Sequence, residues 1–551
     1  MRLKPSFTAC ARLAAAAALV AALSGYDQSL FASEQSPPAA QPAAQAPPPQ
    51  RPLAVPALPP SQAGTGPVLR LSVEEAVALS LEQNLGIRAD RLTPQIEDMT
   101  VASARAAFAP QFFTRWNTSG ESSPPASFLA GSGATISEDR FTTSTGLQQQ
   151  LGWGGASYSL AFDTARVETT RFTSFNPQLS SSISATYTQP LLRNFKIDGF
   201  RQQLLLSRTQ REIADVQVTQ TITTTTRNVR NAYWDLVFAV ASHRVQVQSL
   251  ELAQEQLKNN RTRVEVGTLA PIDIIEADAE VARNEEAVIV AEANIKTAED
   301  VLRALVLSPE RPDFWQLRIE PTEDPVLQPR TIDVDAAVSN ALANRTDLIE
   351  TRKQLEQVDI NVRYFSNQKM PDLNVLASYN AIGLGGTEFL FGEGGFPPPV
   401  IGSANRPFSS VLGDAFGLDF PTWAVGLQVG YPLGTSNAEA NLARSRLQKT
   451  QTQTNLRNVE MQIVTAVRDV GRRVATNFQR VEATRKAQTF AEQRLSAEQK
   501  KFSVGMSDTF RVLQAQRDLA IARNNLLRAV LDYNRTLNDF DAIQKAPVLG
   551  R

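Results

Sequence analysis

The stretch that best indicates the fold is residues 229–264, VRNAYWDLVFAVASHRVQVQSLELAQEQLKNNRTRV. Its seam positions advance alternately by four and three residues: Val229, Tyr233, Leu236, Val240, His243, Val247, Leu250, Gln254, Leu257, Arg261 and Val264. This spacing is typical of an α-helix that packs one face against a partner helix. We predict one long helix over residues 194–266, which would reach about 110 Å at about 1.5 Å per residue.

A second helix follows a reversal at Gly267. Residues 272–306 carry an apolar residue at every seventh position, namely Ile274, Val281, Val288, Ile295 and Leu302. Small residues, mostly alanine, hold the second seam position and permit close approach of two helix backbones. Glycine frees the backbone for a turn, so we expect the helix over 272–306 to run back along the first.

The chain contains two copies of this plan. Leu71–Ala78 resembles Ile332–Ser339 at an offset of 261, and Val266-Gly267 matches Val504-Gly505 at an offset of 238. We predict a first repeat over residues 69–308, a linker at 309–330 and a second repeat over 331–545. The expected helices are 72–108, 194–266 and 272–306 in the first repeat, and 332–369, 435–503 and 509–544 in the second.

Between these helices the periodicity changes from 3.6 to 2, which predicts strands within residues 111–190 and 372–432. In residues 423–431 every second residue is apolar. This segment would span about 26 Å at about 3.3 Å per residue, and Trp423 and Tyr431 at its ends are typical of an outer-membrane strand bounded by aromatic girdles. The sheet of a soluble domain with one wet face would alternate in the same way.

Two further segments of the strand regions are less regular. Residues 141–165 contain a Gly152-Trp153-Gly154-Gly155 turn and resemble an extra hairpin of the first repeat. That hairpin either widens a β-barrel or projects as a loop. Residues 383–421 are rich in Gly and Phe, and we expect them to form an extracellular loop.

The amino terminus has the pattern of a secretory signal peptide over residues 1–24. Basic residues precede an unbroken apolar run from Leu13 to Leu23, which is shorter than the about 20 residues that a membrane-spanning helix needs. Residues 25–68 follow as a linker rich in Pro, Ala and Gln, and residues 546–551 form a short tail. We therefore expect an exported protein.

The composition excludes several classes of function. The 551 residues include 55 basic and 56 acidic side chains, so the basic excess of a nucleic-acid binder is missing. The chain has one His and one Cys, so it has almost none of the residues that a catalytic triad or a zinc site requires. We expect no catalytic residues, no metal site and no cofactor, and the chain is not predicted to be an enzyme.

In their order and duplicated spacing, several segments resemble the TolC family of outer-membrane efflux and secretion ducts: residues 71–84, 187–191, 229–236, 263–267, 501–505 and 512–516. The resemblance implies a mixed α/β membrane protein. Each chain of a homotrimer would give about four strands to one twelve-stranded transmembrane β-barrel, and its coiled-coil helices would form a periplasmic α-barrel. The implied partners are outer-membrane lipid, a periplasmic adaptor and, indirectly, an inner-membrane pump.

The same resemblance implies two sets of functional residues. The turns would dock on the adaptor through Val266, Gly267, Thr268, Leu269, Val504, Gly505, Met506 and Ser507. The alternative is that Gly267 and Gly505 only cap helices. A constriction beside the turns would involve Asp273, Glu276, Arg511 and Gln514, and the last two replace acidic residues that the family pattern leads us to expect.

Arg511 leaves three interpretations open. Three copies around a narrow mouth would reduce its preference for cations. Alternatively, Arg511 pairs with Asp273 or Glu276 of a neighbouring repeat, or it is a solvated charge near a helix start.

We predict a passive exit duct that carries substrates from an adaptor and pump complex to the cell exterior. A duct for type I protein secretion would share these features. A structural coiled-coil tether between the envelope layers is the alternative from another class. A stand-alone porin would need neither such long helices nor a paired turn motif.

Overall fold

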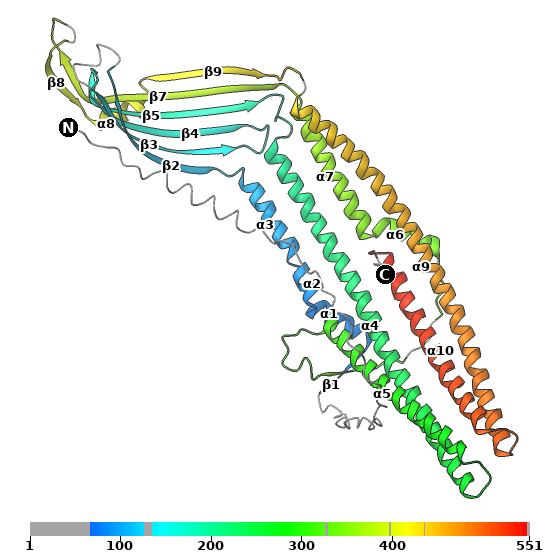
Figure 1. Ribbon diagram of the computed structural model, residues 1–551. Helices are drawn as coiled ribbons and strands as arrows, with labels where there is room; N and C mark the ends of the chain where they lie inside the picture. The colour runs from blue at the N-terminus through cyan, green and yellow to red at the C-terminus, as the bar shows by residue number, and fades with distance from the viewer. Residues whose placement is uncertain (1–66, 126–134, 325–328, 396–397, 435, 548–551) are drawn as a thin grey trace, which may run out of the picture. The chain divides into compact units, whose positions relative to one another are not determined.

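The computed structural model describes residues 67–125, 135–324, 329–395, 398–434 and 436–547 (Figure 1). The expected signal peptide, nearly all of the linker that follows it and the last residues of the tail lie outside these ranges. The described residues form long helices and one large antiparallel sheet, joined end to end by short connections.

The first half of the chain begins with β1 (Val68–Leu71), α1 (Val73–Gln83), α2 (Leu85–Asp90) and α3 (Thr93–Ala106). Four strands follow: β2 (Gln111–Ser123), β3 (Ile136–Gln150), β4 (Ser157–Thr169) and β5 (Phe175–Pro190). The half ends with α4 (Gly199–Glu265) and α5 (Ile272–Val306).

The second half repeats this order with fewer long strands. It contains β6 (Arg318–Pro321), α6 (Val334–Asn344), α7 (Thr346–Gln368) and β7 (Asp372–Phe391). These are followed by β8 (Val400–Arg406), α8 (Phe408–Gly417), β9 (Pro421–Gly430), α9 (Asn437–Ser503) and α10 (Thr509–Ile543).

The two longest helices have the same length and the same kind of start. α4 and α9 have 67 residues each, and both their first and their last residues lie 238 positions apart. Asp198 and Ser436 cap them by accepting a hydrogen bond from the backbone N–H of the third helical residue. These caps explain why the helices begin at residues 199 and 437, after the starts expected at 194 and 435.

The shorter helices expected at 72–108 and 332–369 are interrupted. The first breaks at Asn84, whose side chain caps α2 by accepting from the N–H of Ile87 at 3.2 Å and donates to the carbonyl of Leu305 at 2.9 Å. The second breaks 261 positions later, at Arg345, whose backbone is also extended. The apolar periodicity continues on both sides of each break, so it carries no signal of the interruption.

Each half has its own hydrophobic core. One core gathers Tyr233, Leu236 and Leu302 where α1, α4 and α5 meet, and the other gathers Val467, Val474 and Tyr533 between α6, α9 and α10. In the first core the buried Tyr233 hydroxyl donates to the carbonyl of Leu71 at 3.1 Å and accepts from the N–H of Glu323 at 3.2 Å. This tyrosine therefore ties α4 to the segments around the parallel β1–β6 pair.

We expect Tyr233→Phe to lower the free energy of unfolding by about 1–3 kcal/mol, because the N–H of Glu323 loses its acceptor in a partly buried site, whereas the Leu71 carbonyl still accepts from the N–H of Thr322 at 3.0 Å. Denaturant unfolding followed by circular dichroism measures the change. Tyr431→Phe, at an exposed tyrosine, is the control and should change the value by less than about 0.5 kcal/mol. Equal stabilities of the two variants would contradict a structural role for the Tyr233 hydroxyl.

The sheet has seven strands, which corrects the expected four. Its order is β2-β3-β4-β5-β7, and β8 and β9 pair with successive stretches of the remaining edge of β7; every pairing is antiparallel. Much of the increase comes from the segment around residues 141–165, which forms β3 and β4 within the plane of the sheet. These strands are rich in Ser, Thr and Gln, so their alternation is weak in the sequence.

Residues 383–421 also differ from the expected loop, since they contain the end of β7, then β8 and α8. α8 packs closely on the sheet: a Cβ on Gly383 would lie 2.0 Å from the carbonyl oxygen of Val411. That same oxygen accepts a hydrogen bond from the Ser181 hydroxyl at 3.0 Å. The glycine permits this close approach, which residue composition alone did not reveal.

Candidate functional site

The sheet has one apolar and one polar face, because directly paired residues of neighbouring strands lie on the same side. The apolar face collects Phe112, Trp116, Leu147, Leu160, Phe162, Ile183, Val375, Tyr379, Trp423, Val425 and Leu427. The other face is mostly polar: it contains Asn117, Ser144, Asp163, Ser182, Ser184, Ser378, Asn380 and Gln428, together with the apolar Phe113, Leu376 and Ile382. A sheet of this kind separates an apolar from an aqueous environment.

The two aromatic residues expected at a girdle bracket the last long strand. Trp423 lies in β9 opposite Tyr379 of β7, and its side chain is 73% exposed. Tyr431 directly follows β9 at the end of the sheet nearest the helices and is also exposed.

The turns after α4 and α9, residues 266–271 and 504–508, form what we call the tip. Gly267 and Gly505 have positive φ angles of 73° and 78°. In each turn, the N–H of the following residue bonds back to a carbonyl of the last helical turn, from Thr268 to Arg263 and from Met506 to Lys501, both at 2.8 Å. This arrangement ends the helices with a left-handed glycine, as the turn prediction required.

The side chains at the tip are largely open to solvent. Val266, Val504 and Met506 are 68%, 69% and 75% exposed, and Leu269 and Ser507 are half-buried. Further exposed apolar side chains follow at the starts of α5 and α10: Ile272, Ile275 and Phe510. Exposed apolar clusters of this kind are typical of protein-binding surfaces.

The second turn is held by a polar contact that the sequence did not reveal. The Ser507 hydroxyl donates to a carboxylate oxygen of Glu498 at 2.8 Å, and the Lys501 ammonium lies 2.8 Å from the other. These two donors lower the pKa of Glu498, the ammonium more than the hydroxyl. The contact fixes the turn to the last helical turns of α9.

Arg263 links the ends of α4 and α9. Its guanidinium donates to the carbonyl of Phe502 at 3.2 Å and lies 4.4 Å from the centroid of the Phe502 ring. Both residues also line a groove of about 530 Å³ between the two helix ends. The link connects the two halves of the chain close to the tip, and the separate coiled-coil patterns gave no sign of it.

A buried polar network lies one to two turns above this link. Asn260 is fully buried; its amide donates to the carbonyl of Asp273 at 3.1 Å and lies 3.4 Å from the hydroxyl of Thr509. The Gln256 amide donates to Asn260 at 2.9 Å. Polar side chains within a helix seam specify the register of the helices, so this network aligns α4 with α5 and α10.

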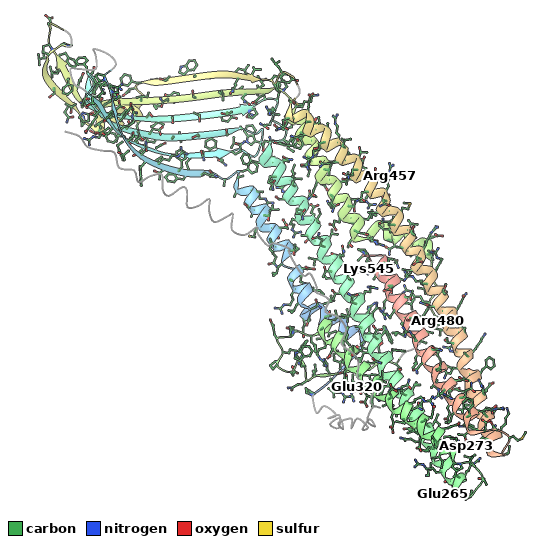
Figure 2. The ribbon with its side chains drawn as sticks, in the orientation of Figure 1. Glu265, Asp273, Glu320, Arg457, Arg480 and Lys545 are labelled. Carbon is green, nitrogen blue, oxygen red and sulfur yellow. The ribbon has the colours of Figure 1, made fainter. Side chains whose placement is uncertain are left out.

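The four residues expected at a constriction lie at the starts of α5 and α10, near the tip. Asp273 is half-buried, whereas Glu276, Arg511 and Gln514 are exposed. Figure 2 places Asp273 near Glu265, at the end of the long helices that carries the tip. Within the described residues, Arg511 pairs with Asp508, the cap of its own helix, at 3.6 Å.

We expect Arg511→Asp to raise the preference of the channel for cations, because each chain would change by two unit charges beside the tip. The reversal potential in a planar bilayer under a KCl gradient measures this preference. Arg485→Asp makes the same change in an exposed ion pair elsewhere on α9 and should leave the reversal potential nearer to that of the wild type. An unchanged reversal potential in Arg511→Asp would place Arg511 outside the conduction path.

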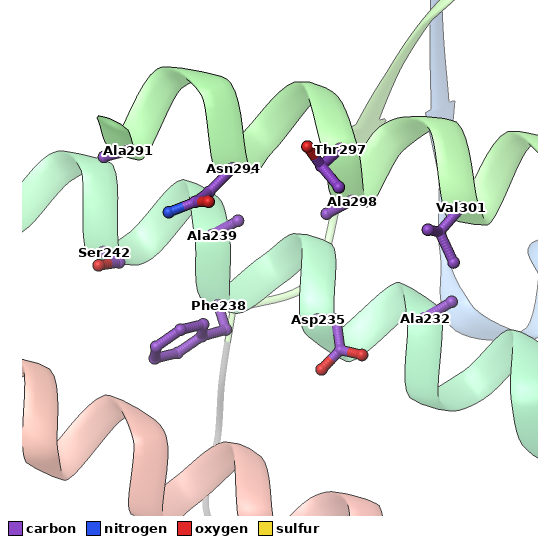
Figure 3. Close-up of a pocket in the computed structure, with 10 residues that line it drawn as sticks. All are labelled: Ala232, Asp235, Phe238, Ala239, Ser242, Ala291, Asn294, Thr297, Ala298 and Val301. Carbon is purple, nitrogen blue, oxygen red and sulfur yellow. The ribbon is translucent and has the colours of Figure 1, made fainter. Parts of the chain in front are cut away.

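A cavity of about 310 Å³ lies between α4 and α5 (Figure 3). Two alanines of each helix line it at heptad spacing: Ala232, Ala239, Ala291 and Ala298. Its carboxylate, Asp235, is 3.0 Å from the guanidinium of Arg535 on α10. The cavity follows from the small alanine side chains, which leave space between the two helices, and the charge of Asp235 is neutralised by Arg535.

A sequence model of the family described as outer membrane efflux protein matches residues 76–306 and 337–543. The chain belongs to the outer membrane efflux protein family. This membership confirms the predicted family and the predicted location in the outer membrane. No curated protein sequence matches the chain. Within the described residues of this efflux-family chain, no helix has both the length and the hydropathy that crossing a membrane requires.

Solved structures share the fold of this outer membrane efflux protein at low sequence identity. The CmeC outer membrane channel of Campylobacter jejuni is 13% identical with a TM-score of 0.62; the match covers 86% of this chain and 85% of CmeC. CusC is 13% identical with a TM-score of 0.61, and the match covers 86% of this chain and 92% of CusC. VceC of Vibrio cholerae is 14% identical with a TM-score of 0.59, and the match covers 86% of this chain and 96% of VceC.

Proposed function

We propose that the chain is one subunit of a homotrimeric channel that passively conducts substrates from a periplasmic adaptor and an inner-membrane pump to the cell exterior. The observation that carries this proposal is the sheet. One of its faces is apolar, and its outer strands, β2 and β9, each have one side without a partner strand in the described part of the chain. Hydrocarbon does not tolerate unpaired backbone groups, so the edges need to close on other copies.

The helices support the periplasmic part of this proposal. A helix of 67 residues reaches about 100 Å at about 1.5 Å per residue. This length is far greater than the about 30 Å thickness of a membrane's hydrocarbon core. The tip at its end exposes Val266, Val504 and Met506, which suits docking on an adaptor. A catalytic step is not part of the proposal, since transport would be driven by the pump.

The proposal is tested in cells that lack the chain. We expect a panel of cationic dyes and antibiotics to accumulate at least severalfold more than in the complemented strain. If accumulation is unchanged but a polypeptide disappears from the culture medium, the type I secretion alternative holds. If neither transport changes and the outer membrane detaches from the cell body, the chain is a tether.

A further inference from the structure

We propose that the outer-membrane barrel of this protein has eighteen strands, six from each of three chains (β2, β3, β4, β5, β7 and β9), in place of the twelve that the family resemblance implies. β8 is not counted separately, because it pairs with the far end of the same edge of β7 that β9 occupies. The inference rests on the proposed trimer. It assigns β3 and β4 to the barrel wall and makes the outlet about one and a half times as wide, because barrel diameter grows roughly linearly with strand number.

The first observation is that β3 and β4 pair along their full length between β2 and β5. β3 pairs with β2 from Gln148 opposite Gln111 to Ile136 opposite Ser123. β4 continues the sheet from β3 to β5 in the same way. β3 has 15 residues and β4 has 13, more than the about 9–11 that a tilted membrane-spanning strand needs.

The second observation is the anchoring of the turn between β3 and β4 at the end of the sheet nearest the helices. The carbonyl of Gly154 accepts from the Gln189 amide at 3.0 Å. A Cβ on Gly155 would lie 2.3 Å from the carbonyl oxygen of Asn194, which itself accepts from Arg201 of α4 at 2.5 Å. The hairpin therefore begins at the junction with the helical part and is built into it, unlike a projecting loop.

The third observation is that β3 and β4 share the two faces of the rest of the sheet. Leu147 and Leu160 lie on the apolar face, as does Phe162, whose ring stacks on Phe416 of α8, whereas Ser144 and Asp163 lie on the polar face. From Tyr158 to Thr164 the apolar face of β4 carries no charged residue. Lipid outside and water inside are the environments that such strands fit.

The width of the helical part agrees with eighteen strands. Next to the sheet, contacts follow the order α3, α4, α7 and α9 within one chain, so three chains would place twelve helices around the tunnel. Helices about 8–10 Å apart give a ring about 31–38 Å across. Strands about 4.8 Å apart and tilted by about 40° give a ring about 36 Å across for eighteen strands, but only about 24 Å for twelve.

We test the strand order with cysteine pairs, which is practical because Cys10 is the only native cysteine and lies in the expected signal peptide. Thr114 and Thr145 face each other across β2 and β3, with 3.0 Å between their hydroxyls. We expect Thr114→Cys with Thr145→Cys to form a disulfide within one chain in the membrane. Thr114→Cys with Ile183→Cys should stay reduced, since β3 and β4 separate these positions.

The reverse result, a bond between positions 114 and 183 but none between 114 and 145, would overturn the inference because β2 would then pair directly with β5. Trimers that show this reverse bond would leave the proposed function standing. If the wild-type protein forms no trimers, the proposed function is rejected instead.

The width is measured separately with polyethylene glycols added to the external side of a planar bilayer. Removal of residues 136–169 takes out β3 and β4 and keeps β2 antiparallel to β5. We expect the largest polymer that enters from outside to have a radius about one third smaller in this variant. An unchanged limit in trimers of the variant would contradict the wide outlet. If the variant forms no trimers, the cysteine pairs alone decide whether β3 and β4 belong to the barrel wall.

Discussion

Replacing Gly505 with tryptophan is expected to abolish transport while leaving the trimer intact. Gly505 lies at the tip with a φ angle of 78°, and among the described residues no heavy atom other than those of Gly505 and its two chain neighbours lies within 4 Å of the position that a Cβ would take. A new side chain would therefore project into solvent beside Val504 and Met506, where the adaptor is proposed to dock. A loss of about 2 kcal/mol or more of docking free energy would weaken the complex about thirtyfold or more.

Gly505→Ala is the matched control. It introduces the same strain of about 1–2 kcal/mol, because any L-residue resists a positive φ angle, but it adds almost no bulk. Substrate accumulation in cells and chemical crosslinking of subunits measure the two variants side by side. Full transport by the tryptophan variant would reject docking at this turn. Loss of trimers in both variants would show that Gly505 serves only the fold.

Replacing Arg263 with alanine is expected to open the tip. The hydrogen bond to the Phe502 carbonyl and the contact with the Phe502 ring join the ends of α4 and α9. Together they are worth about 1–3 kcal/mol. Since 1.4 kcal/mol corresponds to about a tenfold change in an equilibrium constant, we expect the occupancy of the open state to rise about tenfold in single-channel recordings.

Arg261→Ala is the control for Arg263→Ala. Arg261 is two residues away and pairs with Asp278 at 3.0 Å, and both side chains are about half exposed. Such a surface pair contributes little, and it joins α4 only to α5 of the same half. An unchanged open-state occupancy in Arg263→Ala, or an equal rise in both variants, would contradict the role assigned to the link.

The sequence predicted the parts of the fold that depend on short-range pattern. The seam of residues 229–264 lies within α4, and the glycines at 267 and 505 end the long helices with positive φ angles. The mixed α/β fold of the family is confirmed by the structural neighbours. These features follow from periodicity and from backbone freedom, which neighbouring residues determine.

Features that depend on distant residues could not be predicted. The break at Asn84 needs its amide to reach Leu305, and the tip link joins Arg263 to Phe502 of the other half. β3 was left between two interpretations, because a strand rich in Ser, Thr and Gln is recognised only when its partner strands are known. The docking and constriction residues stay predictions, although Arg511 is now placed beside Asp508.

The central claim is that three copies of this chain form one continuous channel. Single-channel conductance of the purified protein in a planar bilayer, recorded after crosslinking has counted the subunits, tests it most directly. The account predicts covalent trimers that give small, discrete currents, which increase when Arg263 is replaced by alanine. A water-soluble monomer or dimer that gives no current would contradict the channel, and the long helices would then form a periplasmic tether.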